Sequence, residues 1–367
     1  MKTLAISLIV LLIAFSACKK NRLPGNQQEV PLPEVALNTR VLTIGLSHIW
    51  EIVYGPDQQL WITERGGKIS RVNPQTGVVT LLHNVPDVVA NGEGGLLGMA
   101  INPQFTNNPW VYVVYNYNTT SGYKEKVVRY NYSGGTLNNP LTIIDLIPAS
   151  SIHNGSRLLI TPDQKLLITT GDANVADNAQ NTASLSGKIL RVNMDGTVPA
   201  DNPLPGNRIW TFGHRNPQGL VQVGDKLYAS EHGPNNDDEV NLIVKARNYG
   251  WPIVEGFCDK AAEQVFCAAN NVVEPLMAWT PTIATCGLTY YNSDFIPQFK
   301  NSLLLLSLKG ARLTQLKLNE SGDRILGSKD FFLNEFGRLR SICQSPDGKI
   351  YIGTSNGSVD KIIEIAK

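Results

Sequence analysis

The chain has 367 residues, and its 32 Lys and Arg residues nearly balance its 31 Asp and Glu residues, leaving a formal net charge of +1. A near-neutral chain offers no strong field for a polyanion, so we expect no nucleic-acid partner. Glycine (32 residues) and proline (21) are plentiful, while charged residues make up only 17%. This composition suits many short strands joined by tight turns.

Residues 1–17 have the organisation of an export signal. A lysine precedes an apolar core at 4–15, and a pair of small residues stands directly before Cys18. The core is too short for a relaxed membrane span. The segment resembles a bacterial lipoprotein signal, in which Cys18 becomes the lipidated first residue and 18–40 form a flexible, Pro-rich tether. We therefore expect a lipid-anchored protein of the bacterial cell envelope, in the periplasm or at the outer-membrane surface; the alternative is plain secretion, with Cys18 incidental.

Four further cysteines would meet an oxidising compartment after export. Cys258 and Cys267 lie nine residues apart in a loop-like region, which favours a local disulfide. Cys286 and Cys343 form either a second pair or two free thiols. Neither a Cys-x-x-Cys motif nor a His-rich zinc spacing occurs, which disfavours a transition-metal enzyme.

From residue 40 onward the sequence favours strands. No long stretch keeps the apolar 3.6-residue period, whereas short β-rich runs at 110–117, 165–170 and 349–354 are bounded by Gly, Pro, Asn and Asp. This pattern predicts an all-β domain over residues 41–367.

One phrase of turn, strand, polar loop and returning strand recurs along this domain. GPDQQLWITERGGKISRVNPQTG at 55–77 is echoed at 161–173 with a continuation at 187–196, again at 345–365, and more briefly at 223–233. Four-stranded units of roughly 50 residues stacked around an axis make a β-propeller, and about 330 residues would give six blades. The sequence thus predicts a six-bladed β-propeller with four-stranded blades. A sandwich pair or a jelly roll does not explain the recurrence.

Four polar stretches carry more than turn chemistry demands. They are SIHNG (151–155), GHRNPQGL (213–220), SEHGPNNDDE (230–239), and the pair LSLKG (306–310) with FGRLRS (336–341). In a propeller, loops that are distant in sequence converge at one end of the channel, so these stretches are candidates for a common pocket.

Two of these stretches suggest acid–base chemistry and anion binding. His153 is a candidate general base, because the imidazole pKa is tuned across neutral pH by small changes of environment; the alternative is a structural hydrogen-bonding histidine. Arg215 beside Asn216 offers a planar cationic fork next to an amide, which suits a carboxylate or a developing oxyanion. An inter-blade salt bridge is the alternative for Arg215.

The remaining stretches suggest a cation and a polyanion. Around Gly233 and Pro234 the backbone leaves carbonyl oxygens available, the type of ligand that calcium prefers; an acidic surface turn is the alternative. Arg338 and Arg340 lie two residues apart, on one face of an expected strand. If they face the channel together with Lys309, a polyanionic ligand would relieve their repulsion; a solvated strand face is the alternative.

Taken as a set, these segments resemble the soluble PQQ-dependent glucose/sorbosone dehydrogenases, also called aldose sugar dehydrogenases, from about residue 45 to the C-terminus. The resemblance is carried by EGGLLGMAINPQF (93–105), IHNGSRLLITPDQKL (152–166), GKILRVNMDGTVPADNP (187–203), GHRNPQGL, SEHGPNNDDEVNLIVKARNYGWP (230–252) and RLRSICQSPDGKIYIG (338–353). It implies a six-bladed propeller that binds pyrroloquinoline quinone (PQQ), a planar tricarboxylate, together with calcium. The implied reaction oxidises the C1 hydroxyl of an aldose sugar to a lactone and passes a hydride to the quinone.

The resemblance also implies a role for individual residues. His153 would be the general base, Arg215 would stabilise negative charge at the quinone C5 oxygen, and Asn216 would orient the cofactor. Glu93 would contact substrate, although the best-known member has Gln there, and Ile152 stands where that member has Asp. Neither change favours glucose in particular.

Further implied roles concern the metal and the cofactor carboxylates. Gly233 and Pro234 would give backbone carbonyls to calcium, with His232 beside them, and the cofactor carboxylates would pair with Lys309, Arg338 and Arg340. Since the chain has no haem-attachment Cys-x-x-Cys-His motif, an external electron acceptor is expected. The alternative function is a non-catalytic, carbohydrate- or protein-binding surface propeller, because the fold alone does not fix activity.

Overall fold

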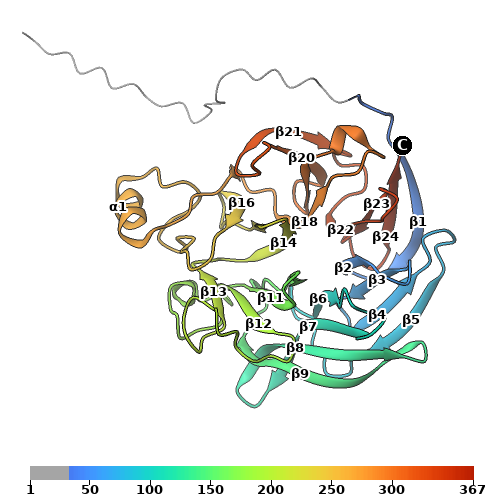
Figure 1. Cartoon of the computed structure of the whole chain (residues 1–367), viewed down its shortest axis with the longest axis horizontal. Helices are drawn as coiled ribbons and strands as arrows, with labels where there is room; N and C mark the ends of the chain where they lie inside the picture. Colours follow the sequence, from blue (N-terminus) through green and yellow to red (C-terminus); the bar gives the residue numbers. More distant parts are fainter. Residues whose placement is uncertain (1–32) are drawn as a thin grey trace, which may run out of the picture. The chain divides into compact units, whose positions relative to one another are not determined.

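The computed structural model describes residues 33–367, which belong to one compact unit. Within the described residues, 24 strands form six four-stranded antiparallel sheets arranged around a common axis (Figure 1). This confirms the predicted six-bladed β-propeller. The predicted lipoprotein signal, Cys18 and most of the tether lie outside the described residues.

Each blade runs from an inner to an outer strand. The first strands of successive blades contact one another and surround the axis: β2 (Ile49–Tyr54), β6 (Leu96–Ile101), β10 (Leu158–Ile160), β14 (Pro217–Val223), β18 (Thr285–Tyr291) and β22 (Leu339–Gln344). The second strands are β3 (Leu60–Glu64), β7 (Trp110–Thr119), β11 (Lys165–Thr170), β15 (Lys226–Glu231), β19 (Ser302–Ser307) and β23 (Ile350–Thr354).

The third strands are β4 (Lys68–Val72), β8 (Gly122–Ser133), β12 (Lys188–Asn193), β16 (Asp238–Ile243), β20 (Arg312–Leu318) and β24 (Asp360–Ala366). The outer strands are β5 (Val79–Asn84), β9 (Thr136–Pro148), β13 (Ile209–Phe212), β17 (Met277–Trp279), β21 (Ile325–Phe331) and β1 (Asn38–Leu46). Because β1 pairs with β24, the start of the propeller completes its last blade and closes the ring.

The repeated phrase in the sequence is the turn that leads into the second strand of a blade. In two of its copies the hydroxyls of Thr161 and Ser345 donate to Asp163 and Asp347, two residues on. In the first copy the Asp57 carboxylate accepts from the Gln59 backbone N–H at 3.3 Å. These Asp and Ser/Thr turns are purely local, which is why the sequence alone shows the repeat.

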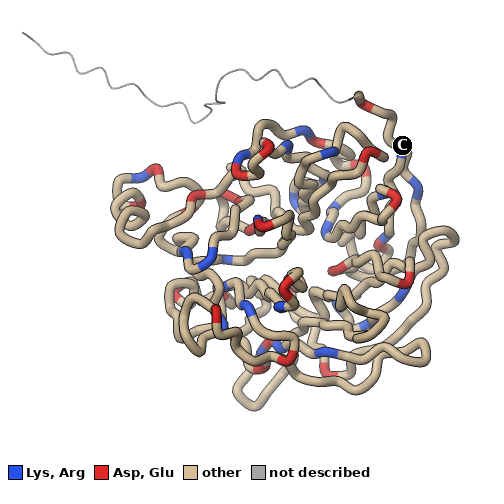
Figure 2. Tube along the Cα trace, viewed as in Figure 1, with Lys and Arg blue, Asp and Glu red and all other residues tan. Residues whose placement is uncertain are grey.

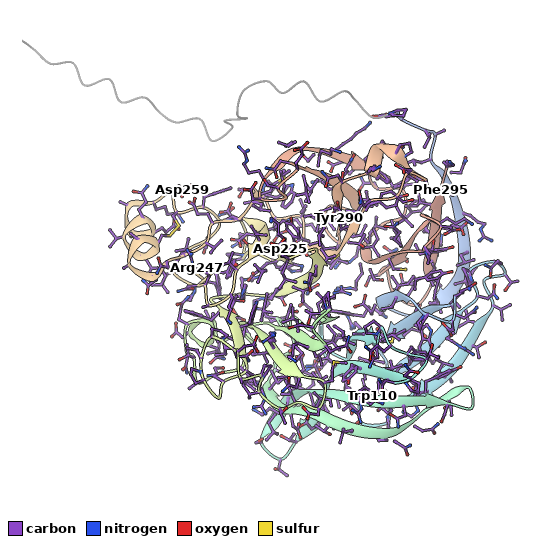
Figure 3. The ribbon with its side chains drawn as sticks, viewed as in Figure 1. Trp110, Asp225, Arg247, Asp259, Tyr290 and Phe295 are labelled. Carbon is purple, nitrogen blue, oxygen red and sulfur yellow. A yellow bond between two sulfur atoms is a disulfide. The ribbon has the colours of Figure 1, made fainter. Side chains whose placement is uncertain are left out.

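The apolar core lies in layers between neighbouring blades, where side chains fill the space between the sheets (Figure 3). One layer joins Tyr112 and Val127 of the second blade to Leu166 and Leu190 of the third, all buried. Charged residues of both signs are interspersed along the chain (Figure 2), consistent with the near-zero net charge. Across residues 33–367, no helix is long and apolar enough to cross a membrane.

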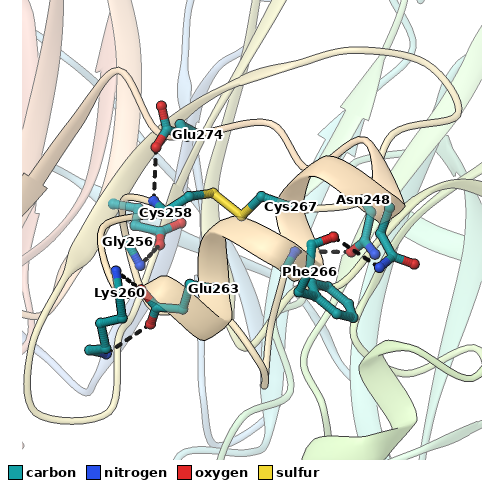
Figure 4. The surroundings of a disulfide bond; sticks show 11 residues. Asn248, Gly256, Cys258, Lys260, Glu263, Phe266, Cys267 and Glu274 are labelled. Atoms are coloured by element: carbon teal, nitrogen blue, oxygen red, sulfur yellow. Dashed lines mark hydrogen bonds and ion pairs between the residues drawn. A yellow bond between two sulfur atoms is a disulfide. The ribbon is translucent and has the colours of Figure 1, made fainter.

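The predicted disulfide between Cys258 and Cys267 is present (Figure 4). It links the start of an insertion in the fourth blade to helix α1 (Ala261–Asn270), which the sequence pattern had not indicated. The helix begins where Lys260 donates its backbone N–H to Glu263 at 3.1 Å, and it ends at Asn271 in the left-handed region. Short 3₁₀ helices lie at Ala176–Ala179 (η1) and Pro297–Phe299 (η2).

The other two cysteines, Cys286 and Cys343, are buried free thiols, which decides between the two alternatives.

Replacing both disulfide cysteines (Cys258→Ser with Cys267→Ser) is expected to destabilise the α1 insertion. The bridge spans nine residues, and closing a loop of that length in the unfolded chain contributes about 2–3 kcal/mol. Hydrogen exchange of the amides in α1 should report this loss as faster exchange. Unchanged exchange in α1 would show that the helix holds without the bridge.

Candidate active site

The topology gathers the candidate residues at one end of the propeller. Strands alternate in direction within each blade, so the loops between blades and the loops joining second to third strands lie at the same end. The predicted site residues lie in these loops or next to them: Glu93 (β5–β6), His153 (β9–β10), Arg215 and Asn216 (β13–β14), His232, Gly233 and Pro234 (β15–β16), Lys309 (β19–β20), Arg338 (β21–β22) and Arg340 in β22.

His153 forms a pair with a buried carboxylate. Its Nδ1 lies 2.8 Å from Oδ1 of Asp172, whose side chain is 2% exposed, while the His153 side chain is 13% exposed. The second Asp172 oxygen, Oδ2, accepts from the indole N–H of Trp251 at 2.9 Å. With Nδ1 engaged by Asp172, Nε2 is the nitrogen left to accept a proton from a substrate. This is the geometry of a general base held by an orienting carboxylate.

The pair depends on a close approach of two loops. His153 and Gly155 both have positive φ, 58° and 67°. A Cβ on Gly155 would lie 2.7 Å from the backbone N of Gly171, next to Asp172, so only glycine allows this contact. Gly155 N–H also donates to Oδ1 of Asn216 at 2.9 Å, which joins the His153 loop to the β13–β14 loop.

Glu231, at the end of β15, forms hydrogen bonds with three successive residues of the β13–β14 loop. Its Oε2 lies 2.9 Å from Nδ1 of His214, and its Oε1 accepts from the backbone N–H groups of Arg215 and Asn216. His214 is fully buried and stacks on Tyr249 with ring centroids 4.6 Å apart. His214 is therefore a structural brace, while the side chains of Arg215 and Asn216 are directed elsewhere.

Three buried polar atoms near this loop have no partner among the described residues: Nε of Arg215, Nδ2 of Asn216 and Nε2 of His232. The Arg215 guanidinium makes one hydrogen bond, to the His232 carbonyl at 3.2 Å, and lies 5.3 Å from the Trp251 ring. Burial lowers the pKa of His232 to about 3, helped by Arg340 and Arg215, so its ring is neutral at pH 7. Unpaired buried polar atoms are costly and rare, and their concentration here indicates a ligand site.

The cationic side chains differ in burial. Arg340 is 6% exposed and donates to Oε1 of Gln218 at 2.9 Å and to Oγ of Ser355 at 3.4 Å. Burial lowers the pKa of Arg340 to about 10, and the guanidinium forms no ion pair within residues 33–367. A buried charge without a counter-charge is expensive unless an anionic ligand joins it.

Arg338 and Lys309 are exposed. The inner strand β22 begins at Leu339, after Arg338, and its pairing shifts register between Leu339 and Ser341. Arg338 thus lies at the rim while Arg340 lies inside. Lys309 lies in the β19–β20 turn, where its Nζ is 3.4 Å from Oγ1 of Thr282.

His232, Gly233 and Pro234 line a pocket together with Arg215, Glu231 and Trp251. The described residues include no cluster of three or more His, Cys, Asp or Glu side chains that could hold a metal ion. Asp237, Glu239 and Glu255 also line this pocket, so both backbone carbonyls and carboxylates offer oxygen atoms to a cation there. Glu93 is at the other side of His153, where its Oε2 accepts the His153 backbone N–H at 3.4 Å.

Sequence reasoning did not single out Asp172, Glu231 or Trp251. Asp172 follows the second copy of the repeated phrase, in TTGDA, and Trp251 is in NYGWP. A signal for Asp172 is that the last copy carries Ser355-Asn356 in place of Gly-Asp after the strand, so this acid is not part of the turn pattern.

The fold and the site define a propeller with a carboxylate-held histidine, unpaired buried polar atoms and a buried arginine gathered at one end. A profile of the Glucose / Sorbosone dehydrogenase family matches residues 46–363, and the chain belongs to that family of oxidoreductases.

Among similar proteins is quinoprotein glucose dehydrogenase B of Acinetobacter calcoaceticus, 33% identical over 88% of this chain and 86% of that protein. Aldose sugar dehydrogenase YliI of Escherichia coli is 31% identical over 88% of this chain and 91% of its own. The PQQ-bound aldose sugar dehydrogenase of Streptomyces coelicolor has a similar structure, with a TM-score of 0.77 and 31% identity over 91% of this chain and 99% of its own.

Proposed function

We propose that this protein is a PQQ- and calcium-dependent dehydrogenase that oxidises the C1 hydroxyl of aldose sugars to lactones. The observation that carries the proposal is the His153–Asp172 pair beside the unpaired donors of Arg215 and Asn216 and the buried charge of Arg340. The similar proteins that are named quinoproteins or hold PQQ support the same cofactor here.

The residues fit this cofactor. PQQ is a planar tricarboxylate, and Arg340 supplies a buried positive charge that lacks a counter-charge, with Arg338 and Lys309 at the rim. Arg215 and Asn216 supply donors for the quinone oxygens. Gly233 and Pro234 offer adjacent backbone carbonyls in the pocket, oxygen ligands of the kind that calcium takes, with His232 next to them.

The chemistry that bound PQQ supplies is acceptance of a hydride from the sugar C1. Nε2 of His153 takes the proton of the C1 hydroxyl while the C1–H bond breaks, so the sugar loses one proton and one hydride and C1 becomes the lactone carbonyl. Asp172 stabilises the imidazolium that forms at His153. Glu93 lies beside the base, where it would contact the sugar. An external acceptor would take the electrons, since the sequence has no haem-attachment motif.

The decisive test is reconstitution. Purified protein should reduce an artificial dye with at least one of a panel of aldoses only when PQQ and calcium are both present, and EDTA should abolish turnover. Dye reduction that persists without PQQ, or no turnover with any aldose, would overturn the proposal. A spectral shift of PQQ on titration separates this function from a non-catalytic carbohydrate- or protein-binding propeller, which has no reason to bind the cofactor tightly.

We propose that the protein resides in the bacterial cell envelope, in the periplasm or at the outer-membrane surface, and is anchored to a membrane through a lipid on Cys18. This rests on the signal-like sequence before Cys18 alone.

A further inference from the structure

A buried carboxyl group that the proposed reaction does not use lies beneath the active site. Glu125, in β8 of the second blade, is 1% exposed. Its Oε2 lies 2.6 Å from Oγ of Ser156 and 3.5 Å from Nδ2 of Asn116. Its Oε1 is buried without a partner among the described residues. A carboxyl in such a place needs a reason, because burying it is costly.

On one side, Glu125 reaches the loop that carries Glu93. Asn116 accepts the Gly95 N–H on its Oδ1 at 3.0 Å and pairs with Gly95 through its own backbone N–H, also at 3.0 Å. Its carbonyl accepts the Val89 N–H at 2.9 Å. Asn116 therefore holds both ends of the segment 89–95.

On the other side, Glu125 reaches the loop that carries His153. Ser156 is fully buried, and its Oγ lies 3.0 Å from the Asn154 carbonyl oxygen. The Asn154 side chain forms hydrogen bonds with both the backbone N–H and the carbonyl of Ser150. The Ser156 backbone N–H donates to the carbonyl of Thr169 in β11 at 2.7 Å. Asp172 follows shortly after the end of this strand. Ser156 thus closes the turn on which the base sits.

The Ser156 hydroxyl has one hydrogen for two acceptors, Glu125 and the Asn154 carbonyl. A protonated Glu125 can donate to Ser156, which then donates to Asn154, so both bonds form. An ionised Glu125 takes the Ser156 hydrogen and leaves the Asn154 carbonyl without it. Burial raises the pKa of Glu125 from 4.5 to about 8, opposed only in part by Ser156 and Asn116, which favours the protonated form at neutral pH.

We propose that Glu125 is a positioning residue that ties the Glu93 loop to the His153 loop from their buried side. It adds to the direct bonds of Glu93 to the Ser151 carbonyl (2.7 Å) and the His153 backbone N–H (3.4 Å), and so helps to hold the substrate contact at a fixed distance from the base. This inference rests on the proposed function for its catalytic consequence, but the tie itself is a property of the apo-protein. Among titratable groups, Tyr123 on the same strand interacts with Glu125. Arg65, after β3, interacts with Tyr123 and Glu93, and Glu93 and His153 are carried by the two loops that Glu125 joins.

The test compares Glu125→Ala, Glu125→Gln and the wild type by hydrogen exchange of the apo-protein. Glu125→Ala should speed exchange about tenfold or more in segments 89–96 and 153–157 and leave the outer strands unchanged. Glu125→Gln keeps a neutral donor for Ser156, but its amide nitrogen cannot accept from Asn116, so at pH 6.5 segment 153–157 should match the wild type while segment 89–96 loosens. Ser156→Ala should loosen segment 153–157 alone. Glu320→Ala, an exposed glutamate in the β20–β21 turn, is the matched control.

A pH series adds a signature that a purely structural role would not give. As pH rises from 6.5 to 9, segment 153–157 should lose protection in the wild type but not in Glu125→Gln. Segment 89–96 should not change in the wild type, because the ionised carboxylate still accepts from Asn116. The melting temperature of the wild type should also fall over this pH range. Because the folded-state pKa is raised, the stabilisation by Glu125 is complete below its unfolded pKa, near 4.5, and is lost as pH rises through about 8. Glu125→Gln should flatten this fall.

Activity gives the second readout. In the reconstituted enzyme, Glu125→Ala should lower kcat by about tenfold to a hundredfold, because a small displacement of a catalytic group is enough for such a loss. Glu125→Gln, which keeps the bond to Ser156 only, should restore part of kcat at neutral pH. If Glu125→Ala leaves both segments as protected as in the wild type, or speeds exchange equally throughout the propeller, the proposal is wrong. An inactive wild type would overturn the proposed function, while the exchange data would still decide the role of Glu125.

Discussion

Replacing His153 with alanine is expected to lower kcat for sugar oxidation by about 10²–10⁴-fold, the usual contribution of a positioned general base. Binding of PQQ should be unchanged, because the cofactor contacts proposed here come from Arg215, Asn216 and Arg340. His153 is mostly buried and its Nδ1 is engaged by Asp172. The substitution therefore removes Nε2 as a proton acceptor and no proposed cofactor contact. The measurement is dye reduction at saturating aldose, with PQQ titrated separately by its spectrum.

Two further variants sharpen this result. Asp172→Asn keeps the size of the side chain but removes the charge that stabilises an imidazolium at His153, so it should give a smaller loss of kcat at unchanged PQQ affinity. His83→Ala is the matched control, since His83 lies in β5 and packs on Tyr130 with ring centroids 5.0 Å apart. Wild-type kcat in His153→Ala would remove this histidine from the reaction and leave the proposed mechanism without a base.

The propeller was predictable because its signal is local. The Asp and Ser/Thr turns at Asp163 and Asp347 bond within two residues, so each blade repeats the same short phrase in the sequence. The blade count then follows from the length of the domain. Helix α1 was not predictable in the same way, because it is short, lies in a single blade and is tied by Cys258–Cys267.

The site was predictable only in part, because its bonds join distant loops. The polar stretches identified His153, Arg215 and Asn216 as candidates, but the choice between structural and functional roles needed their partners. Asp172 becomes the partner of His153 only because Gly155 lets two loops meet.

The spacing of Arg338 and Arg340 predicted one shared strand face. The first lies before the strand and is exposed, while the second is inside it and buried.

Replacing the buried Arg340 with methionine is expected to stabilise the apo-protein and to weaken PQQ binding. The guanidinium is buried against Gln218 and Ser355 without an ion pair in the described part of the chain, and exchanging buried ionic groups for apolar ones of similar volume is often neutral or stabilising by about 1–4 kcal/mol. If a PQQ carboxylate pairs with Arg340, the loss of this buried charged partner should weaken binding by about 2–5 kcal/mol. Urea unfolding of the apo-protein measures the first effect and PQQ titration the second.

Arg338→Met is the matched control, because it removes the same charge from an exposed position instead of a buried one. Arg338→Met removes an exposed guanidinium, so the free energy of unfolding of the apo-protein should change by no more than about 0.5 kcal/mol, and PQQ affinity should fall less than in Arg340→Met. Opposite signs for stability and affinity in Arg340→Met would mean that the propeller keeps a destabilising charge inside for the sake of an anionic ligand. Loss of stability in the apo-protein would instead mean that the bond to Gln218 outweighs the cost of burial, and Arg340 would then be a brace between blades.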